Sequence, residues 1–366
     1  MKKVALFGGS FDPIHLGHVD VIRSILETEY YDALWVIPCR LSPGKSTPTL
    51  DPNSRLTMLT DVCTVWDSVT VLDLELMSEG PSYTITTVET LQAQHPETQF
   101  ELWMGMDQFE KLETWHRAED LVQLIGINVF DRDSTRNQAQ IEAMHRGVLM
   151  FLVLRYHSVN ARPVSSSEIR AALNAGDSVQ GLVPRQTLRY LRTAFPQCRM
   201  PYVTGIAGRA GSGKSTYAKK ISDEKNVVLI ELDKLGHEVL EREDIQAQLM
   251  QQFGPDIKTD TGEINRSKLG AIVFNDPEKL AQLNRLVHPL IKAACLETIK
   301  DASTDVIIEG ALIEEIGLLD YCDRYIVMDV PDMVAIARNK RHIKPILIQQ
   351  RSRQEFIKNA DQVIST

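Results

Sequence analysis

The chain has 366 residues, which is too long for one ordinary hydrophobic core and suits two domains of roughly 150 to 200 residues each. Hydrophobic residues make up 43% of the chain and charged residues 24%, as in globular proteins that work in water, and a formal net charge of -9 argues against a protein that coats nucleic acid. No apolar stretch approaches the length of a membrane span and the five scattered cysteines include no Cys-x-x-Cys pair, so we expect reduced thiols, a cytoplasmic location and no membrane partner.

Glycines and histidines follow the first apolar run of the chain. That run predicts a strand, and apolar residues that recur later at helical spacing predict a helix. Between the two elements the sequence reads Phe-Gly-Gly-Ser-Phe-Asp-Pro-Ile-His-Leu-Gly-His, residues 7–18. We predict that Asp12-Pro13 starts the helix. His15 and His18, three residues apart, then share one face at its positive end. Such a turn suits a phosphate, because glycines let the backbone approach and imidazoles donate to phosphoryl oxygens.

This motif resembles the His-x-Gly-His motif of the nucleotidyltransferase superfamily, whose members transfer an AMP group from ATP to a phosphate. The resemblance implies that ATP is a substrate and that His15 and His18 are catalytic. It also implies an ATP site in the turn, with the residues Gly8, Gly9, Ser10, Phe11 and His18.

Further apolar runs predict the strands of the first domain. They lie at residues 33–38, 69–76, 100–106, 127–130 and 149–154. Helical patterns separate several of these runs. Strands that alternate with helices predict a parallel sheet covered on both faces, with a ligand site at the carboxyl ends of the strands.

Three later segments narrow the resemblance. Residues 81–87 predict a helix start with hydroxyl residues at the N-cap, and residues 103–107 end a strand ahead of Trp115. Residues 164–170 read Val-Ser-Ser-Ser-Glu-Ile-Arg. Over about residues 1–195 the chain resembles bacterial nicotinate-nucleotide adenylyltransferases, which carry Ser-Tyr-Thr-x-x-Thr, Gly-x-Asp with a downstream Trp, and Ile-Ser-Ser-Thr-x-Ile-Arg in this order.

The resemblance implies nicotinate mononucleotide as the acceptor, with Trp115 stacked on its flat ring. The residues implied to lie near this nucleotide are Thr84, Thr87, Gly105, Asp107 and Trp115. Ser166 and Arg170 are implied to bind ATP phosphates.

One loop departs from the family pattern. The family carries Pro-His-Lys after its second strand, whereas this chain has Pro43-Gly44-Lys45. We expect Lys45 to reach a phosphate as a catalytic residue, with Arg55 beside it.

A second domain begins after residues 193–201, which hold two prolines and little periodicity. We predict domains at residues 1–198 and 199–366. A strand pattern at residues 202–207 precedes Gly-Arg-Ala-Gly-Ser-Gly-Lys-Ser, a complete phosphate loop in its strand-loop-helix setting. In such a loop Lys214 neutralises β- and γ-phosphate oxygens and Ser215 binds Mg²⁺. The expected ATP-binding residues are Gly208, Gly211, Ser212, Gly213, Lys214, Ser215 and Thr216.

Nearly all of residues 200–366 resemble dephospho-CoA kinases, on segments that include Leu-Ile-Glu-Leu-Asp at 229–233, Leu-Val-His-Pro at 286–289 and Asn-Ala-Asp at 359–361. The resemblance implies that dephospho-CoA is the acceptor and that Asp233 takes the proton from its ribose 3'-hydroxyl, although an aspartate at that point is also a usual helix N-cap. Arg338 and Arg341 resemble the arginines of the lid over ATP. Residues 311–315 depart from the family's Pro-Leu-Leu-Phe-Glu, and residues 342–350 are shortened and lack an expected Arg, so slow turnover or a changed acceptor stays open.

These patterns predict an α/β protein of two domains, a Rossmann-like nucleotidyltransferase fold followed by a P-loop kinase fold, each with a parallel sheet flanked by helices. The leading function is a fused enzyme that uses Mg²⁺, ATP, nicotinate mononucleotide and dephospho-CoA. One alternative gives the first domain to phosphopantetheine adenylyltransferase, so that the chain is a CoA synthase, but that family's Arg-Gly-Leu-Arg segment is missing. Another makes the kinase domain a nucleotide sensor without turnover. The oligomeric state stays open.

Overall fold

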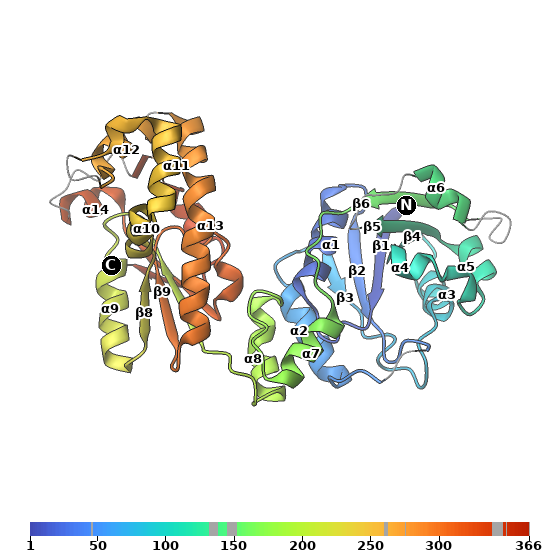
Figure 1. Ribbon diagram of the computed structural model, residues 1–366. Helices are drawn as coiled ribbons and strands as arrows, with labels where there is room; N and C mark the ends of the chain where they lie inside the picture. Colours follow the sequence, from blue (N-terminus) through green and yellow to red (C-terminus); the bar gives the residue numbers. More distant parts are fainter. Residues whose placement is uncertain are drawn as a thin grey trace. The chain divides into compact units, whose positions relative to one another are not determined.

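The computed structural model describes residues 1–44, 47–131, 138–144, 152–259, 263–274, 276–338, 347–348 and 350–365, with Gln138, Glu142 and Arg338 described in their backbone only. Two compact units, Met1–Arg199 and Met200–Thr366, make up the chain (Figure 1).

A six-stranded parallel sheet forms the centre of the first unit, in the order β3-β2-β1-β4-β5-β6. Its strands are β1 Lys2–Gly9, β2 Ala33–Pro38, β3 Val69–Val71, β4 Thr98–Gly105, β5 Gly126–Asp131 and β6 Leu154–Ser158. Its helices are α1 Leu16–Glu27, α2 Pro52–Cys63, α3 Thr84–Gln94, α4 Met106–Phe109, α5 Ala118–Leu124, α6 Gln138–Met144, α7 Ser166–Ala175 and α8 Arg185–Ala194.

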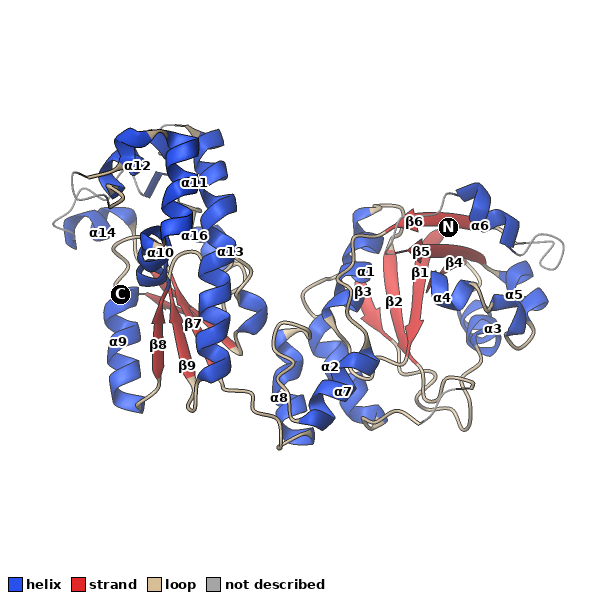
Figure 2. Ribbon diagram, viewed as in Figure 1, coloured by secondary structure: helices blue, strands red, loops and turns tan. Residues whose placement is uncertain are grey.

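Helices cover both faces of this sheet. On one face α3 and α5 pack on β1 and β4 in a core that includes Val88, Leu121 and Leu102. Helix α1 lies on the other side of the sheet (Figure 2). It buries its apolar residues Val21, Ile22 and Ile25. This arrangement places the carboxyl ends of the strands at one edge, where α1 begins after β1.

Two predicted strands have different bounds. The run at 69–76 is a strand only to Val71, because the Asp73 carbonyl accepts the N–H groups of Leu76 and Met77 in a turn and so leaves the ladder. The strand predicted at 149–154 begins at Leu154 and continues to Ser158, while residues 149–151 lie outside the described part. β6 is an edge strand with polar residues, and a search for apolar runs misses such strands.

The second unit holds a five-stranded parallel sheet in the order β11-β10-β7-β9-β8. Its strands are β7 Val203–Ala207, β8 Val228–Glu231, β9 Val306–Glu309, β10 Arg324–Asp329 and β11 Gln362–Ser365. Its helices are α9 Lys214–Lys225, α10 Leu232–Glu241, α11 Glu243–Phe253, α12 Arg266–Val273, α13 Pro277–Asp301, α14 Asp332–Arg338 and α16 Arg353–Ile357. One large core joins α10, α11 and α13 to the sheet, and α9 packs Ala218 against Ile206 and Ile307 in a separate cluster.

Both units therefore confirm the predicted class of parallel sheets flanked by helices. In the described residues, no helix combines the length and the apolar character that crossing a bilayer requires.

Candidate functional site

The two histidines of the glycine-rich turn cap α1 for each other. His15 is the N-cap, and its Nδ1 accepts the His18 N–H at 3.3 Å while the His18 Nδ1 accepts the His15 N–H at 3.2 Å. The rings stack with centroids 3.6 Å apart. Because both Nδ1 atoms accept backbone protons, a neutral ring carries its own proton on Nε2. Each imidazole is thus held in the tautomer that presents an Nε2–H donor.

Asp12 does not start the helix, so that prediction is wrong. Its carboxylate, 3% exposed, accepts the N–H groups of Thr49 and Leu50 at 2.8 and 2.9 Å. The helix starts at Leu16, after His15. Asp12 instead joins the turn to the end of the loop that follows β2.

The start of α7 lies against the same turn. Ser166 Oγ donates to the Pro13 carbonyl at 3.0 Å, and an Arg170 guanidinium nitrogen donates to the Asp12 carbonyl at 2.7 Å. Ser165 and Glu168 form a capping box that fixes this end of α7. The fold therefore brings two predicted phosphate ligands to the histidine turn from more than 150 positions away in the chain.

The backbone of the turn is shaped by its small and aromatic residues. β1 ends at Gly9, beside Gly8 and ahead of Ser10. A Cβ on Gly9 would lie 3.2 Å from the Phe11 ring, which is 1% exposed and packs on His18 with centroids 4.9 Å apart. Phe11 has a φ of 45°, in the left-handed region. The Phe11 ring thus packs against the His18 imidazole and restricts its position.

A second group of predicted residues lies near the end of β4. Gly105 ends that strand, and its Cα is so close to Asp107 that an added Cβ would stand 2.7 Å from Oδ1. Trp115 is partly buried against the core under α3. Tyr83, next to Thr84, contacts the His116 ring with centroids 4.5 Å apart, which brings the start of α3 to the Trp115 segment.

The N-cap of α3 is Tyr83, which makes no side-chain cap bond, so the prediction of a hydroxyl cap is wrong. Thr87 is buried instead, and its hydroxyl donates to Glu75 at 2.6 Å. Burial raises the pKa of the Glu75 carboxyl, whereas hydrogen bonds from Thr87 and Ser82 lower it. Glu75 was not predicted, because nothing in its own segment indicates that the chain folds back onto α3.

In the second unit, glycines shape the loop between β7 and α9. Gly208, Gly211 and Gly213 have φ angles of 150°, 78° and 86°. A Cβ on Gly208 would lie 2.5 Å from the Met328 carbonyl oxygen, so only glycine fits there. Lys214, Ser215 and Thr216 begin α9 directly after the loop. Ser212 is 2% exposed, and its hydroxyl has no partner in the described part of the chain.

Glu309 ends β9 beside the phosphate loop. It is 2% exposed, accepts the Ser215 hydroxyl at 3.0 Å and lies 3.7 Å from Lys214 Nζ. Burial raises the pKa of the Glu309 carboxyl, Lys214 and Ser215 lower it, and Asp233 raises it further. Glu309 was not predicted from the sequence, although a signal was present: the short apolar strand pattern of residues 306–308 ends in this carboxylate.

These oxygens fit Mg²⁺, because that ion binds one or two protein oxygens together with substrate phosphates. The fit rests on the Ser215 hydroxyl and the Glu309 carboxylate, which already meet beside Lys214. Within the described ranges, no cluster of three or more His, Cys, Asp or Glu could hold a metal by protein side chains alone.

Asp233 is exposed in the first turn of α10. The N-cap of that helix is Glu231, so the alternative explanation of Asp233 as the cap is wrong. Glu231 and Glu309 are register partners at the carboxyl ends of β8 and β9. Asp233 therefore stands at the edge of the sheet where the phosphate loop also lies.

Comparisons with known proteins match each unit to a protein family. Residues 6–172 match the sequence model of a family described as cytidylyltransferase-like, and residues 202–366 match that of dephospho-CoA kinase. A probable nicotinate-nucleotide adenylyltransferase of Bacillus pumilus is 33% identical over 193 residues, which are 52% of this chain and 96% of that protein. The chain belongs to the nicotinate-nucleotide adenylyltransferase family through its N-terminal half.

A probable nicotinate-nucleotide adenylyltransferase of Shewanella frigidimarina is 29% identical over 204 residues, 52% of this chain and 97% of that protein. Among solved structures, the nicotinic acid mononucleotide adenylyltransferase of Plasmodium falciparum, complexed with NaAD, is 22% identical, with a TM-score of 0.44, over 53% of this chain and 96% of that one. The resemblance to adenylyltransferases and to dephospho-CoA kinases is thus confirmed, and the chain is a nucleotidyltransferase fused to a P-loop kinase.

Some family positions lie outside the described residues. Lys45 of the Pro-Gly-Lys loop and Arg341 are two of them. A third family position, Arg338, is described in its backbone only. Their predicted roles in the adenylyltransferase loop and in the kinase lid stay predictions. The prediction that Arg55 stands beside Lys45 stays a prediction, because Lys45 lies outside the described residues; Arg55 itself is 1% exposed and donates to the Ser10 and Cys39 carbonyls, both at 2.7 Å.

One kinase departure has a structural explanation. Glu314 stands where the dephospho-CoA kinases carry a phenylalanine, and its side chain is 11% exposed. Arg351 pairs with it at 3.0 Å, and Asn359 donates to it at 3.0 Å. A largely buried carboxylate is tolerated when an arginine and an amide donate to it in this way.

The phosphate loop of the kinase unit also contacts the segments that flank residues 339–346. Arg209 pairs with Asp332 at 2.5 Å and donates to the Leu347 carbonyl. The Ala210 N–H donates to the Gln350 side chain at 2.8 Å. These contacts join the start of the loop to α14 and to the described residues that follow it, Leu347 and Gln350.

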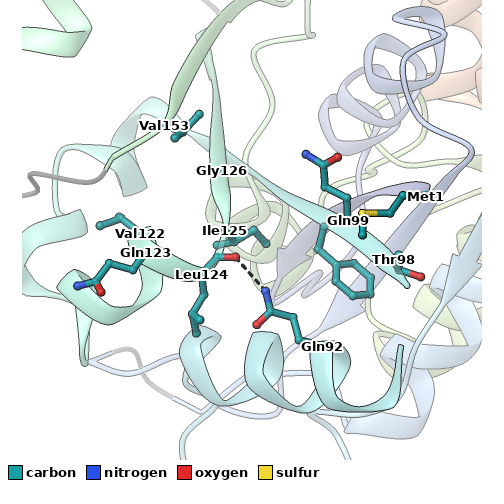
Figure 3. A pocket seen from close by; sticks show the side chains of 11 residues that line it. Met1, Gln92, Thr98, Gln99, Val122, Gln123, Leu124, Ile125, Gly126 and Val153 are labelled. Carbon is teal, nitrogen blue, oxygen red and sulfur yellow. Dashed lines mark hydrogen bonds between the residues drawn. The ribbon is translucent and has the colours of Figure 1, made fainter. Parts of the chain in front are cut away.

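Figure 3 shows a hollow on the adenylyltransferase unit, and the residues that line it include none of the predicted site residues. Its walls include Thr98 at the start of β4 and Gly126 at the start of β5, and Gln92 donates to the Leu124 carbonyl at 2.9 Å within it. Ligands of parallel sheets bind at the carboxyl ends of the strands, whereas this hollow is at the amino ends, so it is not the candidate site.

Proposed function

We propose that the chain is a bifunctional enzyme of cofactor synthesis. Its first unit transfers AMP from ATP to nicotinate mononucleotide, giving deamido-NAD and pyrophosphate. Its second unit phosphorylates the ribose 3'-hydroxyl of dephospho-CoA with ATP. The single observation that carries the proposal is the presence, in one chain, of two separate glycine-rich turns, each set between a strand's carboxyl end and a helix with its own histidine, arginine or lysine side chains.

In the adenylyl transfer, an oxygen of the acceptor phosphate attacks the α-phosphorus of ATP, and the bond to pyrophosphate breaks. The acceptor oxygen is already an anion at neutral pH, so no general base is needed. The protein aligns the two phosphates and stabilises the charge on the pentavalent phosphorus. We assign that stabilisation to the Nε2–H groups of His15 and His18 and to Arg170, and we keep for Lys45 the role that its sequence motif predicts.

In the kinase reaction, Asp233 accepts the proton of the ribose hydroxyl while its oxygen attacks the γ-phosphorus. Lys214 neutralises the β- and γ-phosphate oxygens, and the backbone of residues 208–215 surrounds the β-phosphate. Bound Mg²⁺ would add charge neutralisation at those oxygens, held by Ser215 and Glu309. We propose a cytoplasmic location, because the five free cysteines would stay reduced there.

One turnover assay tests both halves. The purified chain is mixed with ATP, Mg²⁺ and, separately, nicotinate mononucleotide, nicotinamide mononucleotide, 4'-phosphopantetheine or dephospho-CoA. We expect pyrophosphate release with nicotinate mononucleotide and ADP release with dephospho-CoA. Efficient adenylylation of 4'-phosphopantetheine without use of a pyridine nucleotide would replace the first assignment by a CoA synthase. ATP binding without phosphorylation of dephospho-CoA would make the second unit a nucleotide sensor.

Replacing Trp115 by alanine is expected to raise the KM for nicotinate mononucleotide by about tenfold, which corresponds to the ~1.4 kcal/mol that an aromatic contact contributes. The KM for ATP should stay unchanged, because the proposed ATP residues lie at the histidine turn. Initial rates at varied nucleotide concentration measure both constants.

The matched control is Trp66→Ala, since Trp66 is also partly buried but follows the far end of α2. An unchanged KM in Trp115→Ala, or an equal rise in both variants, would show that Trp115 is only a core residue.

A further inference from the structure

Arg55 is a charged side chain enclosed in the first unit. It lies in α2, it is 1% exposed, and its guanidinium donates to backbone carbonyls at four positions. The acceptors and distances are Ser10 at 2.7 Å, Cys39 at 2.7 Å, Arg40 at 3.3 Å and Leu50 at 3.3 Å. One side chain thus joins the histidine turn, the segment after β2 and Leu50, two residues ahead of α2.

The charge of Arg55 is balanced by carbonyl dipoles. Burial lowers the pKa of its guanidinium, while Cys39, Asp12 and Asp51 raise it, and an arginine stays protonated in either case. None of the described carboxylates lies within ion-pair distance of it. Burying a charge costs stability unless hydrogen bonds compensate, so the four carbonyls must face it for the fold to hold.

That requirement fixes the orientation of two peptide groups. A trans peptide points its C=O and its N–H in opposite directions, so a carbonyl held toward Arg55 turns the next N–H away from it. The Cys39–Arg40 peptide shows this, because its N–H donates to the Ser82 hydroxyl at 3.0 Å. The Ser10–Phe11 peptide is held in the same way by the Ser10 carbonyl.

The N–H of Phe11 therefore points away from Arg55. Within the described residues it makes no hydrogen bond, although the neighbouring turn is heavily bonded. It stands between Gly9 and the two histidines, in the turn where the proposed function puts ATP. A backbone N–H in that position is a donor for an anion.

We propose that Arg55 is a positioning residue of the adenylyl-transfer site, which holds the Ser10–Phe11 peptide so that the Phe11 N–H donates to a phosphate oxygen of ATP. The inference rests on the proposed function of the first unit. Arg55 does not touch ATP itself and acts through the backbone of the turn.

The test variant is Arg55→Lys, which keeps the charge but replaces the planar fork by one ammonium that cannot reach all four carbonyls. We expect the KM for ATP to rise about tenfold and product inhibition by pyrophosphate to weaken by a similar factor. Inhibition by adenosine, which has no phosphate, should not change. A residue with only a structural role would lower the unfolding temperature without this selectivity for phosphate.

The matched control is Arg189→Lys, because Arg189 also contacts α2, through Asp61 at 2.5 Å, but is exposed. Folding of each variant is checked by circular dichroism. A folded Arg55→Lys variant with wild-type KM for ATP and wild-type pyrophosphate inhibition would overturn the proposal.

A measurement on the wild-type chain covers the case in which Arg55→Lys does not fold. With ¹⁵N-labelled phenylalanine, the Phe11 amide resonance is expected to shift downfield with ATP but not with adenosine. No shift with ATP would overturn the inference. Absence of deamido-NAD formation in the turnover assay would instead overturn the proposed function, and the amide shift would still decide whether the turn binds phosphate as inferred.

Discussion

Replacing His18 by alanine is expected to lower adenylyl transfer by about 10²-fold or more, the usual loss when one preorganised donor to a transition state is removed. The variant loses the Nε2–H donor of His18, and it also loses the Nδ1 that accepts the His15 N–H. The second imidazole is then less firmly held. Pyrophosphate release with ATP and nicotinate mononucleotide measures the effect.

Phosphorylation by the second unit serves as the internal reference, because His18 lies in the unit Met1–Arg199 and the phosphate loop lies in the other. His95→Ala is the control, since His95 is exposed at the end of α3 and takes no part in the turn. Wild-type pyrophosphate release by His18→Ala would contradict the assignment of the site.

Replacing Lys214 by alanine is expected to lower ADP release with dephospho-CoA by about 10²-fold or more, because the β- and γ-phosphate charge is no longer neutralised. Glu309 adds to this loss. Its buried carboxylate lies 3.7 Å from Lys214 and, without that cation, would repel the negatively charged phosphates. Adenylyl transfer should be unchanged.

Lys220→Ala is the matched control: this lysine lies on the same helix, is exposed and pairs with Glu224 at 3.8 Å. A parallel fall of both activities in Lys214→Ala, in a chain that circular dichroism shows to be folded, would mean that the two sites are not independent.

Patterns formed by neighbouring residues were readable from the sequence. The phosphate loop of residues 208–215 and the turn of residues 7–18 each combine a strand, glycines and a helix in one stretch, so local geometry follows from local composition. The alternation of strands and helices predicted both parallel sheets for the same reason. Even here the predicted helix start was wrong. Asp12-Pro13 has the local preference for a helix start, but the Asp12 carboxylate accepts the Thr49 and Leu50 N–H groups instead of capping the helix.

What the sequence determined by itself was therefore the class of each unit and the two glycine-rich turns between a strand and a helix, whose parts lie close together in the chain. Only the tertiary structure decided which distant residues join them: Arg170 at Asp12, Glu309 at Ser215, and Arg55 at the Ser10 carbonyl. The reason is physical. A hydrogen bond between residues 45, 94 or 158 positions apart depends on how the helices pack on the sheet, and no local preference of the residues records that packing.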